Sequence, residues 1–119
     1  MKNKSFLKRL GFATSGIQGA LRTEKSFRTQ VMGAIFAVMV LIVLMPEPLW
    51  WGLFAICIGL VLALELVNTA LESFIDTVHP APNAGIKKAK DCAAGAVLIA
   101  SAISIAVFTA FLFTRLPTS

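Results

Sequence analysis

Three acids and an amide recur at helical spacing where a strongly apolar run ends. At about 100° per residue, Glu65, Asn68, Glu72 and Asp76 fall within an arc of roughly 80° on one helix face. A charged side chain at the centre of a membrane helix costs roughly 2.5 to 3.5 kcal/mol, so acids kept in such a run usually have a task. Three carboxylates on one face repel one another unless a cation joins them, and oxygen ligands suit magnesium better than zinc. The stripe therefore predicts a divalent-metal site.

Two classes of chemistry fit this stripe. Phosphoryl transfer needs magnesium to bridge phosphate oxygens, a cation to hold them, and a carboxylate near the acceptor hydroxyl. Membrane acids can instead carry protons or cations in a small transporter. The sequence has no phosphate-binding loop, no catalytic loop of the protein-kinase type and no pattern of a serine triad. The spacing alone leaves a kinase and a transporter open.

The composition indicates an all-α integral membrane protein. Of the 119 residues, 57% are hydrophobic and only 14% are charged, which is far from a soluble domain. A helix needs about 20 residues to cross roughly 30 Å of hydrocarbon. We expect one membrane domain over residues 1–119, with spans at about 29–46, 49–76 and 91–114. Cys57 and Cys92 fall at different depths, so no disulfide is expected between them.

The cations are concentrated on one side of these spans. Of the 11 Lys and Arg residues, all but Arg115 precede the first span or lie between the second and third. The positive-inside rule therefore places the N-terminus and the 77–91 loop in the cytoplasm, and the Pro46–Pro48 turn outside. Anionic lipid headgroups explain this charge, and we expect no nucleic-acid partner.

An amphipathic helix is predicted before the first span, over about residues 5–22. Its apolar residues recur every three or four positions and its basic groups are set apart, as in helices that lie in the headgroup plane. No cleavable signal peptide is expected, because the basic N-terminus does not lead directly into an apolar core. The short segment after this helix contains Glu24, which alone would be an ordinary surface acid paired with Arg28 at i+4.

Counting along the second span places the acids in depth. Glu65 lies about 24 Å beyond Leu49, just inside the cytoplasmic boundary, and Glu72 lies about 10 Å further toward water. Trp51 falls at roughly 320° on the same face as Glu65 and about 21 Å away from it. This apolar face could bind acyl chains or pack against other subunits. His79, beside Pro80, is expected to be a solvated loop residue.

Four blocks of sequence carry a resemblance that covers essentially the whole chain. The E-x-x-N-x-A-x-E block followed by A-K-D at this separation is far more specific than any single acid. With these blocks the sequence resembles the prokaryotic diacylglycerol kinase family, which includes the undecaprenol kinases. The blocks are Glu24-Lys-Ser-Phe27-Arg28, Glu65-Leu-Val-Asn68-Thr-Ala-Leu-Glu72, Asp76, and Ala89-Lys90-Asp91-Cys-Ala-Ala-Gly-Ala-Val-Leu98.

The resemblance implies a homotrimer of three-span subunits in the bacterial cytoplasmic membrane. Active sites would be shared between neighbouring subunits, and ATP would enter from the cytoplasm. The family's catalytic base matches Glu65, and its Mg²⁺-ligating acids match Glu24 and Glu72. Residues implied to position ATP are Glu24, Asn68, Glu72, Asp76, Lys90 and Asp91. Candidate lipid contacts are Phe27, Arg28 and Glu65, with Trp51 from the apolar face above.

The implied reaction transfers the γ-phosphate of ATP to diacylglycerol and yields phosphatidic acid. Diacylglycerol-type members tend to follow Phe-Arg with Gln-Glu, and undecaprenol-type members tend to place His two residues after that Arg. Here Thr29-Gln30 matches neither pattern. Diacylglycerol is the expected acceptor, undecaprenol is the alternative within the family, and a small cation or drug transporter is the alternative from another class.

Overall fold

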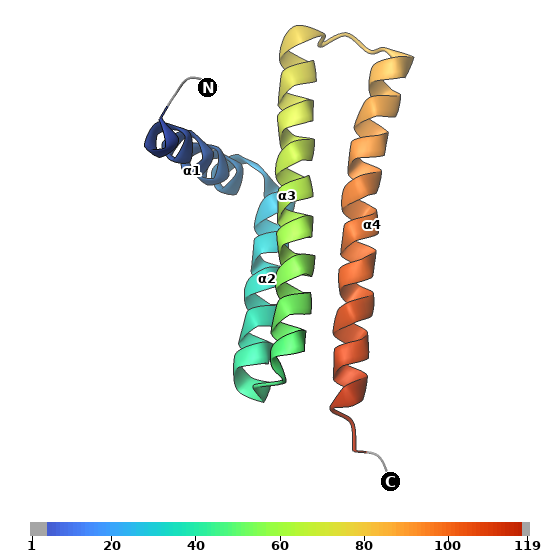
Figure 1. Cartoon of the computed structure of the whole chain (residues 1–119). Helices are drawn as coiled ribbons and strands as arrows, with labels where there is room; N and C mark the ends of the chain where they lie inside the picture. The colour runs from blue at the N-terminus through green and yellow to red at the C-terminus, as the bar shows by residue number, and fades with distance from the viewer. Residues whose placement is uncertain (1–4, 118–119) are drawn as a thin grey trace.

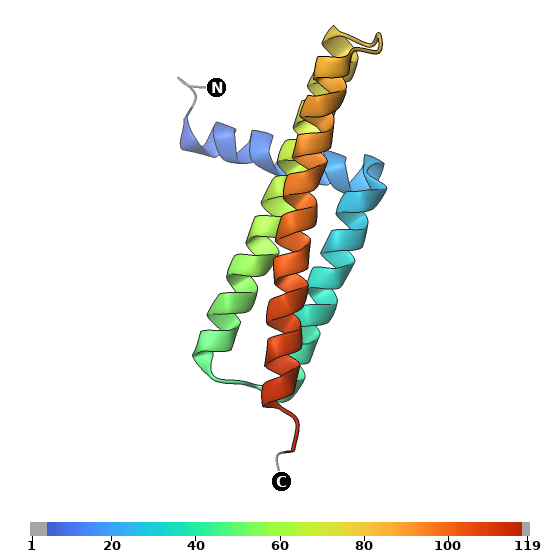
Figure 2. The same ribbon diagram turned by 90° about the vertical axis from the view of Figure 1, so that its right-hand side faces the viewer.

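The computed structural model describes residues 5–117, which form four helices. Three of them run side by side as a bundle, and the first lies crosswise where the second begins, with the third and fourth extending beyond it (Figures 1 and 2). This arrangement places the start of the second helix beside the middle of the third. The helices are α1 (Phe6–Thr23), α2 (Lys25–Leu44), α3 (Pro48–Val78) and α4 (Ala84–Thr114).

Helices α2, α3 and α4 are each long and apolar enough to cross a membrane. Their 20, 31 and 31 residues correspond to helices of about 30, 46 and 46 Å. The prediction of an all-helical fold is therefore confirmed, and three of its helices are candidate membrane spans. A helix also forms at residues 6–23, but its location in the headgroup plane remains a prediction.

Helices α3 and α4 are longer than the predicted spans at the end where the 79–83 connection joins them. α4 begins at Ala84 rather than near residue 91, so the connection comprises residues 79–83 instead of the predicted 77–91 loop. Asn83 explains the early start, because its Oδ1 accepts hydrogen bonds from Gly85 N at 2.8 Å and Ile86 N at 3.1 Å. Hydropathy marks where hydrocarbon ends, whereas the cap marks where the helix begins.

Glu24 forms the sharp junction between α1 and α2. Its backbone is extended, with φ −107° and ψ 106°, while its N–H still donates to Ala20 O at 2.8 Å. One non-helical residue is thus enough to turn the chain from the crosswise helix into the bundle. At the other end of α2, Met45 is left-handed with φ 45°, and Pro48 starts α3 at a position where a missing N–H costs nothing.

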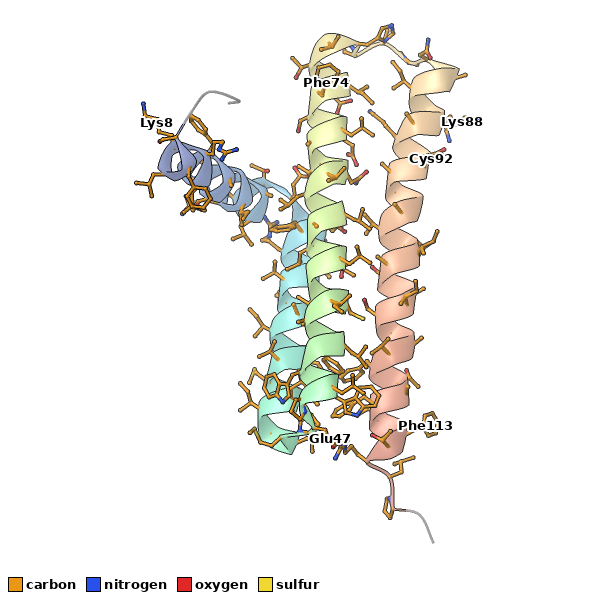
Figure 3. The ribbon with its side chains drawn as sticks, in the orientation of Figure 1. Lys8, Glu47, Phe74, Lys88, Cys92 and Phe113 are labelled. Carbon is orange, nitrogen blue, oxygen red and sulfur yellow. The ribbon has the colours of Figure 1, made fainter. Side chains whose placement is uncertain are left out.

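The best-packed part of the bundle is an aromatic cluster at the end away from α1. Its buried residues are Leu41, Phe54 and Phe111, against which Trp50 and Trp51 pack. The ring centroids of Trp50 and Phe111 are 5.1 Å apart, within the range of favourable aromatic pairs. Figure 3 shows aromatic rings gathered near Glu47, while Lys8 and Lys88 lie toward the other end of the molecule.

Candidate functional site

Glu65 is the one buried charged side chain among residues 5–117, with 3% of its surface exposed. It lies on α3 opposite the first turn of α2, where Phe27 is also buried. Ser26 donates its hydroxyl hydrogen to Glu65 Oε1 at 2.8 Å. A buried carboxyl group is costly unless it is hydrogen-bonded, so this hydroxyl offsets part of the cost of burying Glu65.

The next polar pair along α3 is Asn68 and Glu72. Asn68 Nδ2 donates to Glu72 Oε1 at 2.8 Å, one helical turn away. The other amide atom, Asn68 Oδ1, is fully enclosed and accepts no hydrogen bond within the described chain. A buried acceptor without a donor is unfavourable, so this oxygen is a natural place for a water or a ligand donor to bind.

Asp76 and Lys90 join α3 to α4 beyond this point. Lys90 Nζ lies 2.6 Å from Asp76 Oδ1. Both residues line a hollow of about 410 Å³ beneath the 79–83 connection, together with His79 and Lys87. Cations around a hollow of this size suit a polyanionic ligand. Asp91 points to a different neighbour, because it accepts from Lys87 Nζ at 2.6 Å on the exposed side of α4.

His79 lies at the end of α3, beside this hollow. It caps α3 and is exposed, as expected of a loop residue, and its Nδ1 lies 3.1 Å from Ala81 O. It nevertheless lines the hollow with Asp76. The spacing of three residues between Asp76 and His79 places both on one side of the helix end.

Glu24 does not make the surface pair with Arg28 that its spacing allows. Arg28 Nη1 instead donates to the carbonyls of Leu21 at 3.0 Å and Arg22 at 2.9 Å, at the end of α1. The pairing rule fails because it assumes one continuous helix, whereas the helix breaks at Glu24. The half-buried Glu24 carboxylate accepts a hydrogen bond only from Thr23 Oγ1, at 3.2 Å, within residues 5–117.

The acids of the α3 stripe do not converge on one point. Glu65 and Glu72 are seven residues apart, about 10 Å along the helix, and each accepts from its own neighbour. Across residues 5–117, no group of three His, Cys, Asp or Glu side chains is close enough to hold a metal ion. Magnesium needs fewer protein ligands, because it keeps several waters and binds substrate phosphates. Glu24 and Glu72 are carboxylates of the type it prefers.

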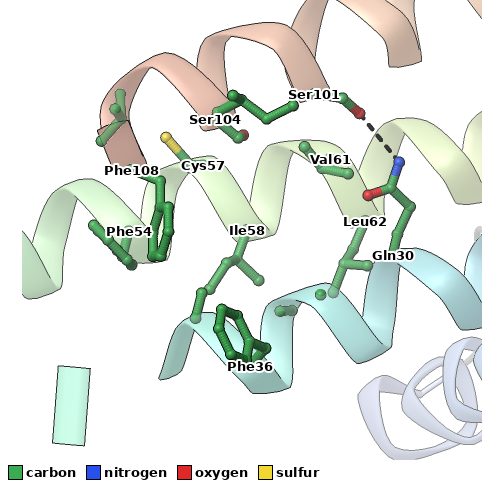
Figure 4. Close-up of a pocket in the computed structure, with 15 residues that line it drawn as sticks. Gln30, Phe36, Phe54, Cys57, Ile58, Val61, Leu62, Ser101, Ser104 and Phe108 are labelled. Atoms are coloured by element: carbon green, nitrogen blue, oxygen red, sulfur yellow. Dashed lines mark hydrogen bonds between the residues drawn. The ribbon is translucent and has the colours of Figure 1, made fainter. Parts of the chain in front are cut away.

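An apolar cavity of about 250 Å³ lies between α2, α3 and α4. Phe54, Ile58 and Val61 of α3 form one wall, and Gln30 bridges the opening by donating from Nε2 to Ser101 Oγ at 3.1 Å (Figure 4). The α3 face that runs from Glu65 toward Trp51 is thus apolar where it lines this cavity. Trp51 contributes to the aromatic cluster, and it is not among the residues that line this cavity.

Comparison with known proteins places these features in a family. The model of the family described as prokaryotic diacylglycerol kinase matches residues 11–112. A diacylglycerol kinase of Synechocystis sp. is 37% identical over 97 residues, covering 81% of this chain but 55% of that protein. The chain thus spans little more than half the length of this relative.

Two further relatives are covered more completely. A diacylglycerol kinase of Helicobacter pylori (strain J99) is 31% identical over 112 residues, covering 94% of this chain and 84% of that protein. An undecaprenol kinase of Bacillus subtilis (strain 168) is 32% identical over 99 residues, covering 83% and 80%. Because the family match extends over most of the sequence and includes every candidate site residue, this chain belongs to the prokaryotic diacylglycerol kinase family.

Proposed function

We propose that this membrane lipid kinase transfers the γ-phosphate of ATP to the hydroxyl of diacylglycerol, giving phosphatidic acid and ADP. The observation that carries the proposal is the buried Glu65 carboxylate, which already accepts a hydrogen bond from a hydroxyl group. Family membership supports it, as do the names of the Synechocystis and Helicobacter relatives.

Glu65 is the general base in this proposal. The acceptor hydroxyl donates its hydrogen to the carboxylate, and its oxygen attacks the γ-phosphorus as the bond to the bridging oxygen of ADP breaks. The proton passes to Glu65. Burial at the apolar end of the polar stripe supports this role, because a lipid hydroxyl must reach the base from the membrane side.

Glu24 and Glu72 are the proposed ligands of Mg²⁺. Their carboxylate oxygens fit the ion, and neither acid is neutralised by a Lys or Arg in the described chain. Held by these two acids, Mg²⁺ would offset the negative charge of the phosphates. Half-buried Asn68 is hydrogen-bonded to Glu72, and its Oδ1 has no donor in the described chain. A water molecule or a donor group of the bound nucleotide would satisfy this oxygen.

ATP is proposed to bind along the stripe toward the 79–83 connection. Lys90 supplies a cation for the phosphates, and Asp76 holds its ammonium group in place at 2.6 Å. The nucleotide would occupy the hollow that these two residues line. Asp91 follows Lys90 directly in α4. Polar partners of the nucleotide in this proposal are Glu24, Asn68, Glu72, Asp76, Lys90 and Asp91.

The lipid is proposed to approach Glu65 along the start of α2. Phe27 is buried there and supplies an apolar surface, while the exposed Arg28 is anchored to the end of α1 by two carbonyls. The cavity below Glu65 and the face that continues to Trp51 provide apolar surface for acyl chains.

The proposed assembly is a homotrimer in the bacterial cytoplasmic membrane, with active sites shared between subunits and facing the cytoplasm. Large apolar side chains remain exposed along α2, α3 and α4, where lipid or other subunits would cover them; they include Met32, Phe36, Met39, Ile56, Leu60, Val67 and Ile103. The cations of the α1 end support the cytoplasmic orientation.

The decisive experiment supplies purified protein in mixed micelles with γ-labelled ATP, Mg²⁺ and one acceptor at a time. Labelled phosphatidic acid from diacylglycerol supports the proposal, and a reaction with no labelled lipid on any acceptor contradicts it. The second candidate acceptor is undecaprenol, which the name of the Bacillus relative favours. Label on polyprenol alone would assign that function instead.

A further inference from the structure

Ser26 makes with Glu65 the kind of hydrogen bond that an acceptor hydroxyl would make with its base. Its Oγ donates to Glu65 Oε1 at 2.8 Å, although the two residues are 39 positions apart in the chain. Ser26 is itself exposed, whereas Glu65 is almost fully buried. The buried base therefore holds the primary alcohol of a residue that is itself exposed.

Serine and a glycerol lipid offer the same reacting group. Both present a primary hydroxyl that is a weak nucleophile until an adjacent base accepts its proton. Because phosphoryl transfer depends mainly on positioning and charge stabilisation, an alcohol already hydrogen-bonded to the base meets the first requirement. We propose that Ser26 is an internal phosphoryl acceptor, which ATP phosphorylates when no lipid occupies the site. This inference rests on the proposed role of Glu65 as the base.

The surroundings of Ser26 suit a phosphate group. Ser26 lies in the first turn of α2, and no side chain caps this helix N-terminus within residues 5–117. Free N–H groups at a helix start attract anions. Glu24, a proposed Mg²⁺ ligand, is two residues away, so the transferring phosphate is delivered to the same end of α2.

The reaction balances without any further reactant. A bond forms between Ser26 Oγ and the γ-phosphorus, the bond from that phosphorus to the bridging oxygen breaks, and ADP leaves. The hydroxyl proton passes to Glu65. The product carries about −1.5 to −2 charges next to the base carboxylate, and its bulk fills the place of the lipid hydroxyl. A phosphorylated subunit therefore loses its lipid kinase activity.

The test is self-labelling of the full chain in detergent micelles with γ-labelled ATP and Mg²⁺ but no lipid acceptor. Wild-type protein should gain one phosphoryl group, which peptide mass spectrometry should place on Ser26. Diacylglycerol at about ten times its apparent KM should lower the labelling rate by roughly tenfold, because it competes for the base. Pre-incubation with ATP and Mg²⁺, before lipid is added, should also lower the initial rate of lipid phosphorylation.

Matched variants isolate the hydroxyl. Ser26→Ala should abolish both the labelling and the loss of activity during pre-incubation. Thr29→Val deletes a hydroxyl one turn later on α2, where it is bonded only to the backbone oxygen of Lys25, and should label as the wild type does. Glu65→Gln should not label, while its helical content and oligomer size should stay those of the wild type.

The outcomes separate this inference from the proposed function. Label on lipid together with no label on wild-type protein, or with label on another residue, overturns the role of Ser26 and leaves the kinase proposal intact. Undiminished labelling of Ser26 in Glu65→Gln also overturns it, since the proton would then have another route. If no lipid is phosphorylated by the wild type, the proposed function itself fails.

Discussion

Arg115 at the end of α4 binds Glu47 in the turn between α2 and α3, with Nη2 and Oε1 2.7 Å apart. The same guanidinium group lies 5.1 Å from the ring centroid of Phe111 and makes a cation–π contact. The ion pair ties the end of α4 to Glu47, which is the only acid at the aromatic end of the described bundle. The hydrogen bond from Arg115 holds the pKa of Glu47 below its ordinary value.

The Glu47–Arg115 pair should make stability depend on pH in one direction. A lowered folded-state pKa means that the pair contributes stability above the ordinary value of 4.5 and loses it as the pH falls through the folded-state pKa. The Tm of wild-type protein in detergent should therefore exceed that of Glu47→Gln slightly at pH 7. The two should converge below about pH 4. A difference that persists or grows in acid would contradict this account.

Phe111 should be a major packing residue of the bundle. Its side chain is 0% exposed and contacts Trp50 and Phe54. Phe111→Ala leaves a cavity in the aromatic cluster and should cost about 3 kcal/mol of unfolding free energy. Phe113→Ala is the matched control, because that ring is 66% exposed and faces outward. Unfolding in mixed micelles should show a large loss for the first variant and little change for the second.

Glu65→Gln should lower kcat by roughly 10²- to 10⁴-fold, as expected when a general base is lost. The apparent KM for ATP should change little, because a base acts on the transition state rather than on nucleotide binding. Glu47→Gln serves as a control for removal of an acid at the far end of α3. Steady-state rates at several ATP concentrations give kcat and the apparent KM for ATP of each variant. A normal kcat in Glu65→Gln would show that Glu65 is a packing residue and not the base.

Glu24→Gln and Glu72→Gln should each raise the Mg²⁺ concentration needed for half-maximal rate and nearly abolish turnover. An amide is a weaker ligand of a hard cation than a carboxylate. Glu47→Gln is a suitable control, because Glu47 pairs with Arg115 at the opposite end of the bundle. An unchanged Mg²⁺ optimum in Glu24→Gln would show that this acid serves only the junction between α1 and α2.

Trp51→Ala should raise the KM for long-chain lipid more than the KM for a short-chain analogue. The reason is that loss of a distant apolar contact affects only acyl chains long enough to reach it. Trp50→Ala is the matched control, because Trp50 packs on Phe111 in the same cluster. Rates with acceptors of two chain lengths give the comparison. Equal changes for both lengths, with a loss of oligomer, would make Trp51 a packing residue.

The helical architecture followed from the sequence because apolar runs and helix geometry are local properties. The grouping of Glu65, Asn68, Glu72 and Asp76 on α3 also followed, since angular spacing along one helix needs no tertiary information. The hydrogen bonds between different helices could not be predicted from the sequence. Ser26 approaches Glu65, and Gln30 approaches Ser101, only because separate helices pack at one particular register.

The junction at Glu24 shows the same limit at short range. Spacing of four residues predicted a pair with Arg28, and the single extended residue between α1 and α2 removed it. Likewise the start of α4 was placed by hydropathy near residue 91, whereas the Asn83 cap starts the helix at Ala84. Caps and breaks depend on individual backbone groups, which averages over an apolar run do not contain.

The unequal lengths of the helices make the chain sensitive to the thickness of its bilayer. α3 is 11 residues longer than α2, so about 16 Å of it extends past the level at which α1 crosses the bundle (Figure 1). Glu65 lies near that level and the Asp76–Lys90 pair well beyond it. A thicker membrane would draw the base deeper into hydrocarbon, and a thinner one would expose it to water. The thickness of the bilayer thus sets the depth at which the lipid hydroxyl and the nucleotide meet.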